Sequence, residues 1–69
     1  MWYMVGIYNS RVRDAIRNGD TPPFLISPDF EQIQYFDMQA TSLEECEKII
    51  EFKWPAANGY VVEYIKTVT

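Results

Sequence analysis

The sequence offers few combinations of residues that could perform catalysis. Cys46 is the single cysteine, and the sequence has no histidine to activate it. Because Cys46 lies in the apolar stripe of a predicted helix, we interpret it as a buried structural thiol. Asp37 and Glu63 are candidates for a carboxylate pair on two predicted strands, although both equally fit polar positions on a solvated face. The glycines are isolated and form no phosphate-binding loop. We therefore expect a protein that is not an enzyme and that has no cofactor or metal site.

The charge balance favours a protein partner over a nucleic acid. The chain has 6 Lys and Arg against 10 Asp and Glu, a net charge of −4. Direct DNA or RNA binding requires an excess of basic surface, which is missing here. The charge is also uneven, because residues 21–69 carry three lysines against eight acids while residues 1–20 carry three arginines against two. A basic protein surface is the partner that this distribution favours.

Two groups of charged side chains are candidates for a partner-binding surface. The first is the acidic side of a predicted helix, formed by Glu44, Glu45, Glu47 and Glu51. The second is an arginine cluster, formed by Arg11, Arg13 and Arg17. Arginine forms bidentate contacts with carboxylates and is frequent in interface hot spots. Each group also has the ordinary interpretation of a solvated helix surface.

Aromatic residues offer a third candidate surface. They make up 16% of the chain, which is more than a core of this size hides comfortably. We expect some of the following to be partly exposed, as in a protein interface: Trp2, Tyr3, Tyr8, Tyr60 and Tyr64. The alternative is a sheet with aromatic side chains packed on both faces.

Length and periodicity predict one small α+β domain over residues 1–69. Strands are expected at 2–8, 31–39 and 60–68, and the clearest helix at 41–54. Residues 10–19 are a short helix or a loop. The fold is thus a three-stranded sheet packed by one main helix. The strand order stays open, with the last two strands either parallel neighbours or separated by the first strand in antiparallel pairing.

Several residues indicate where these elements begin, bend or end. Gly6 within the first strand marks a bulge or a close approach. Ser10 is the expected cap of the short helix and Gly19 its end. Thr41 and Glu44 have the spacing of a capping box at the start of the main helix.

The apolar side chains indicate which sides of the elements face the core. In the second strand, Ile33 and Tyr35 point one way and Phe36 and Met38 the other. The stripe of the main helix consists of Leu43, Cys46, Ile49, Ile50 and Trp54. Phe24, Leu25 and Ile26, in the proline-rich connector at 20–29, are expected to be tucked against the core.

From residue 33 onward the chain resembles a family of small phage proteins. The shared plan is a strand, an acidic amphipathic helix that starts at Thr-Leu or Thr-Ser-Leu, an aromatic–proline–alanine turn, and a Gly-aromatic pair that opens a last strand. The residues that match are Thr41, Leu43, Glu44, Glu45, Trp54, Pro55, Ala56, Gly59, Tyr60 and Val62. This stretch is similar to the RNA polymerase inhibitor of T-seven-like bacteriophages. The same plan also occurs in other tiny phage proteins, some anti-CRISPR proteins among them.

The resemblance implies inhibition without catalysis. Members of the family bind the jaw of the host polymerase's largest subunit and, together with an acidic domain of the primary sigma factor, block the open promoter complex. Two arginines in their last strand contact the polymerase. Tyr64 and Lys66 occupy the corresponding positions here, so one positive charge is retained. The arginine cluster has no counterpart in the family, and the linker before the glycine is one residue longer.

Three functions follow as expectations. The first is a phage-type inhibitor that binds a host protein, with bacterial RNA polymerase as the leading target. The second is an anti-CRISPR or other anti-defence inhibitor that acts on a nuclease complex, either as an acidic DNA mimic or as a plug. The third is an accessory subunit or homodimer held by exposed aromatic side chains. The expected location is the cytoplasm of the infected host, since the sequence contains no apolar run of about 20 residues and its first residues lack the features of a signal peptide.

Overall fold

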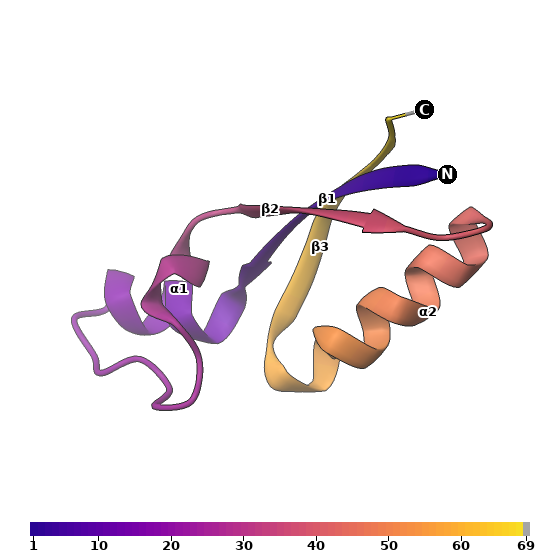
Figure 1. Cartoon of the computed structure of the whole chain (residues 1–69). Helices are drawn as coiled ribbons and strands as arrows, with labels where there is room; N and C mark the ends of the chain where they lie inside the picture. The colour runs from indigo at the N-terminus through magenta and orange to yellow at the C-terminus, as the bar shows by residue number, and fades with distance from the viewer. Residues whose placement is uncertain (69) are drawn as a thin grey trace.

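The computed structural model describes residues 1–68, which form one α+β unit (Figure 1). Three strands and two α-helices alternate along the chain, with a short 3₁₀ helix before β2 and another before β3. Their bounds are β1 Trp2–Asn9, α1 Ser10–Arg17, η1 Pro28–Glu31, β2 Gln34–Gln39, α2 Leu43–Lys53, η2 Ala56–Asn58 and β3 Tyr60–Thr67. The predicted fold class is confirmed, and residues 10–17 are helix rather than loop.

The strands form an antiparallel sheet in the order β2-β1-β3. The first strand is thus central, which resolves the question that the sequence left open. Gly6 pairs with Tyr35 on β2 and with Tyr64 on β3, and the pairing with β3 shifts between Gly6 and Ile7. This shift is a bulge on β3 that leaves Glu63 without a partner residue on β1. Both expectations for Gly6, a bulge and a close approach, are confirmed.

The core lies between one face of the sheet and α2. Alternate residues of β1 enter it, and Cys46 and Ile50 of α2 meet them. The complete buried cluster is Tyr3, Val5, Ile7, Met38, Ala40, Cys46 and Ile50. Beside it, the ring of Phe36 lies 4.7 Å from that of Trp54 and 6.1 Å from that of Phe30. Among the aromatic residues expected to be partly exposed, Tyr3 is buried. In the helix stripe, Leu43 is exposed.

Asn9, the last residue of β1, also caps α1, so the prediction of Ser10 as the cap is wrong. The Asn9 side-chain oxygen accepts from the backbone N–H groups of Arg11 and Val12, at 3.0 and 3.1 Å. Its amide nitrogen donates to Asn58 O at 3.1 Å. Ser10 instead donates its hydroxyl to Gly59 O. Asn9 therefore ties the central strand, the short helix and the turn before β3 together.

The end of α1 follows the prediction. Gly19 has φ +74°, in the left-handed region that glycine enters without strain. Its N–H donates to Ile16 O, and the N–H of Asp20 donates to Ala15 O. These two bonds form the Schellman motif that commonly ends a helix.

The cap of α2 lies one residue later than predicted. Ser42 has extended backbone angles and accepts from the N–H of Glu45, so the capping pair is Ser42 with Glu45, rather than Thr41 with Glu44. Thr41 lies just outside the helix and donates its hydroxyl to the Glu45 carboxylate. Because Thr41 and Ser42 both have hydroxyls suited to capping, spacing alone did not separate them.

Two further expectations about residues 20–39 are wrong. Phe24 and Leu25 are 97% and 91% exposed rather than packed against the core. The strand begins at Gln34 instead of residue 31, because Pro28–Glu31 form a 3₁₀ helix whose Phe30 packs on the core. Phe30 therefore packs against the core, whereas Phe24 and Leu25, which were expected there, do not.

Candidate functional site

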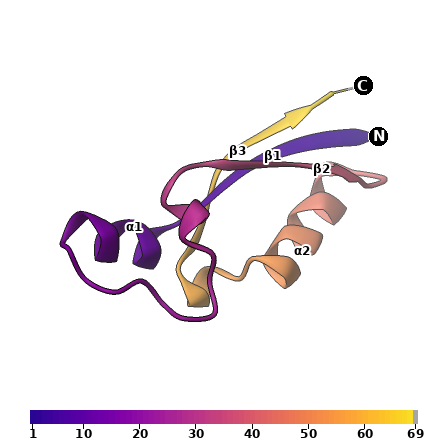
Figure 2. The same ribbon diagram turned by 60° about the vertical axis from the view of Figure 1, so that its left-hand side comes forward.

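One face of the sheet carries no covering helix. The two views place α2 below the sheet and α1 at one end of it, and no element of residues 1–68 lies over the opposite face (Figure 1, Figure 2). Because side chains alternate along a strand, this face receives the residues of β1 that do not enter the core. We call the side chains of Trp2, Met4, Tyr35, Tyr64 and Lys66 the open face.

Gly6 lets two tyrosines meet across the central strand. Tyr35 on β2 and Tyr64 on β3 both pair with Gly6, and their rings form an edge-to-face contact with 6.4 Å between centroids. A Cβ atom on Gly6 would lie 3.2 Å from Tyr35 Cε1, 3.3 Å from Tyr64 Cβ and 2.9 Å from Ile33 Cγ2. Tyr35 is still 61% exposed and Tyr64 38% exposed. The open face therefore presents aromatic surface in a defined arrangement.

Lys66 lies on the open face beside this aromatic pair. It is two residues from Tyr64 on the same strand, and it pairs with Met4, which pairs on its other side with Asp37. Tyr64 and Lys66 thus share one face of the sheet. A lysine next to exposed aromatic rings suits contact with an acidic and partly apolar partner surface.

The arginine cluster does not act as one unit. Arg11 donates to Ala57 O at 2.7 Å, on the side of the turn before β3. Arg13 donates to Glu31 O at 2.9 Å, and its guanidinium carbon lies 3.6 Å from the centre of the Tyr8 ring. Arg17 is exposed and lines a shallow hollow with Arg13 and Tyr35. Two of the three arginines thus bond to the backbone of other segments, and Arg17 remains exposed beside Tyr35.

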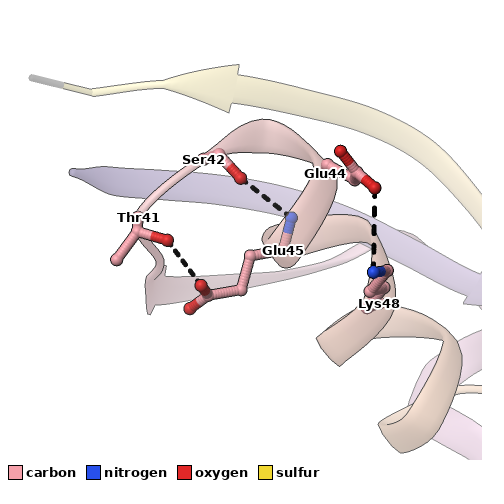
Figure 3. A network of polar contacts seen from close by, with 5 residues as sticks. All are labelled: Thr41, Ser42, Glu44, Glu45 and Lys48. Carbon is pink, nitrogen blue, oxygen red and sulfur yellow. Dashed lines mark hydrogen bonds and ion pairs between the residues drawn. The ribbon is translucent and has the colours of Figure 1, made fainter.

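The four glutamates of α2 are exposed, on the other side of the molecule from the open face. They divide into two pairs with different surroundings. Glu44 forms the expected ion pair with Lys48, with 3.7 Å between the charged atoms, and Glu45 belongs to the helix cap (Figure 3). Glu47 and Glu51 instead line a groove between α2 and β3. The groove, with a volume of about 360 Å³, is a feature that the sequence analysis missed.

The candidates for catalysis are not brought together. Asp37 and Glu63 lie on the two outer strands with β1 between them. Cys46 is fully buried, and its thiol donates to the sulfur of Met38 at 3.3 Å. Burial raises the pKa of the Cys46 thiol, and the charge of Glu47 raises it further. Within residues 1–68, no three His, Cys, Asp or Glu side chains form a group that could hold a metal ion.

Three exposed apolar side chains were also missed. Phe24 and Leu25 protrude from the connector between prolines, and Phe52 of α2 is 88% exposed. The sequence held a signal for the first two, since three prolines around a short apolar run describe a stiff loop with little room to fold back. Phe52 lies outside the helix stripe, and this also indicates exposure.

Comparison with known proteins does not add an identification. No family model, curated protein or solved structure matches the chain. None of the helices within residues 1–68 has the length and apolar character needed to cross a membrane.

Proposed function

We propose that this protein is a small phage-type inhibitor that works by binding a host protein, with bacterial RNA polymerase as the first target. The observation that carries the proposal is the open face, where Tyr64 and Lys66 stand together beside exposed aromatic rings. Interfaces between proteins are enriched in aromatic anchors with charged side chains at their rim. The resemblance of residues 33–68 to the polymerase inhibitors supports the choice of target.

The two sides of the molecule would have different roles in such a complex. The open face contacts the polymerase through Lys66 and the tyrosines. Helix α2 lies on the other side of the sheet, and its four glutamates are exposed there. An acidic surface held near the DNA channel repels the DNA backbone, so inhibition requires no catalytic group.

Charge reversal at Lys66 tests the proposal. We expect the purified protein to bind bacterial RNA polymerase and to inhibit transcription from a promoter, and we expect Lys66→Glu to weaken binding by about 2–5 kcal/mol, as for a buried charge contact. Lys53→Glu is the matched control, because it makes the same change of charge at an exposed position on α2. Binding that is unchanged in Lys66→Glu, or equally weakened in both variants, would contradict the proposal. Recovery of a nuclease complex instead of polymerase would favour an anti-defence role.

The same face supports one other candidate function. Trp2 and Tyr35 are large and exposed, and two copies of the chain could cover them by packing the open faces together. This would be the homodimer predicted as an alternative. A molecular mass that rises with concentration, and that returns to the monomer value in Tyr35→Ser, would favour it over the inhibitor.

A further inference from the structure

A second binding surface lies on the side of the sheet that α2 covers. The groove between α2 and β3 has a volume of about 360 Å³. Most of its lining is apolar and comes from Ile50 and Trp54 on the helix side and from Tyr60, Val62 and Ile65 on β3. Val62 is 39% exposed, so part of this apolar surface is open to solvent. The volume is within the range of about 300–1,000 Å³ that is typical of binding sites.

One rim of the groove is acidic. Glu47 and Glu51 lie one helical turn apart, which corresponds to about 6 Å along the axis. Both are exposed, and neither forms an ion pair within residues 1–68, in contrast to Glu44, which pairs with Lys48. Two carboxylates at this spacing suit one guanidinium or ammonium group that extends over the groove. The rim therefore favours a basic occupant.

The other wall is the edge of the sheet. β3 pairs with β1 on one side, and the order β2-β1-β3 leaves its outer edge as the border of the sheet. An edge strand presents backbone N–H and C=O groups that an extended segment can pair with. When a segment adds to an edge in this way, its alternate side chains enter the neighbouring groove and determine specificity.

We propose that the groove between α2 and β3 binds a short extended segment of a partner protein, in which an arginine or lysine has apolar side chains two residues before and two residues after it. The apolar side chains fill the space over Val62 and Ile65. The basic side chain reaches Glu47 and Glu51. The net charge of −4 attracts basic segments, and the exposed glutamates of α2 concentrate negative charge on this side of the molecule. This site is separate from the open face and does not depend on which protein the open face binds.

Synthetic peptides test the site directly. The probe is a fluorescein-labelled, end-capped heptapeptide, Thr-Leu-Thr-Arg-Thr-Val-Thr, in which the apolar and basic side chains share one face of a strand. The control replaces its arginine with glutamate. We expect the arginine peptide to bind at least tenfold more tightly than the control in fluorescence anisotropy. We also expect binding to weaken as salt increases, because the contact is ionic.

Matched variants locate the binding. Glu47→Gln with Glu51→Gln should weaken binding of the arginine peptide at least tenfold. Glu44→Gln with Glu45→Gln removes the same charge from the same helix outside the groove, and should change binding less than twofold. Lys66→Glu on the open face should also have little effect on the peptide, so this result is independent of the polymerase experiment.

Several results would overturn the inference. The first is no anisotropy change with the arginine peptide up to about 1 mM protein, the range of weak binding. The others are equal binding of the two peptides, and equal loss in the two pairs of variants. A concentration-dependent mass that Glu47→Gln with Glu51→Gln abolishes would assign the groove to a second copy of the chain and exclude the partner segment. Amide chemical shifts that change at Tyr35 but not at Val62 or Ile65 would place the peptide on the open face instead.

Discussion

The Asn9 side chain should account for much of the stability of this small domain. It is completely buried and makes three hydrogen bonds: it accepts from the backbone of Arg11 and Val12 and donates to Asn58 O. Replacing an N-cap residue by alanine costs about 1 kcal/mol. Loss of the bond to Asn58 O adds about 0.5–1.5 kcal/mol. Asn9→Ala should therefore lower the free energy of unfolding by about 2 kcal/mol.

That loss is large for a chain of this length. A single core of this size supplies about 3–5 kcal/mol in total. A loss of 1 kcal/mol shifts Tm by about 4–8 °C in a domain of 60–100 residues, so Asn9→Ala should lower Tm by about 10–15 °C. Urea unfolding followed by tryptophan fluorescence, together with thermal unfolding by circular dichroism, measures both quantities.

Ser10→Ala is the matched control for this prediction. It removes the hydroxyl bond to Gly59 O, but that oxygen still accepts from the Ser10 N–H at 2.8 Å. The control should cost less than about 1 kcal/mol. The assignment of the cap to Asn9 would be refuted if Asn9→Ala changed the free energy of unfolding by less than about 0.5 kcal/mol, or if Ser10→Ala were the more damaging variant.

Two further predictions concern single positions, Gly59 and Cys46. Gly59→Ala should destabilise the fold more than Gly19→Ala, because both glycines have positive φ but only at Gly59 would the new Cβ lie 2.8 Å from Arg11 Cγ, whereas at Gly19 it meets nothing within 4 Å. Left-handed strain alone costs about 1–2 kcal/mol, so equal losses in urea unfolding would contradict the contact with Arg11. The raised pKa of the Cys46 thiol keeps it neutral in the folded protein at a pH where the unfolded chain ionises. Its contribution to stability is therefore complete below the ordinary pKa of 9.0 and declines as the pH rises from there toward the folded-state pKa. The free energy of unfolding should fall less steeply above pH 9 in Cys46→Ala than in the wild type, and parallel slopes would argue against a protected thiol.

The local pattern of the sequence determined the type and approximate bounds of the elements. Runs of apolar, β-branched and aromatic residues indicated the strands. The apolar stripe around Cys46 and Ile50 indicated α2, because its period follows from helix geometry alone. Gly19 could be assigned from local geometry too, because a helix end with positive φ favours glycine. Gly6 indicated a bulge or a close approach, and only the sheet pairing showed which side chains approach it. The net charge and the absence of histidine likewise required no structure.

The tertiary structure determined which strands are neighbours and which side chains pack on the core. The central place of β1 depends on pairing between residues far apart in the chain, which no local pattern encodes. Phe30 rather than Phe24 packs on the core because the 3₁₀ helix at Pro28–Glu31 directs it there.

Long-range packing also explains why the glutamates of α2 and the three arginines have different surroundings. In the sequence the four glutamates of α2 form one acidic run, but only Glu47 and Glu51 border β3, which follows the helix after a turn. The three arginines are also close in sequence, and yet Arg11 and Arg13 bond to Ala57 and Glu31, which the fold brings to them. The sequence by itself supplied the elements and their chemical character. Only long-range packing decided which charges remained available for a partner.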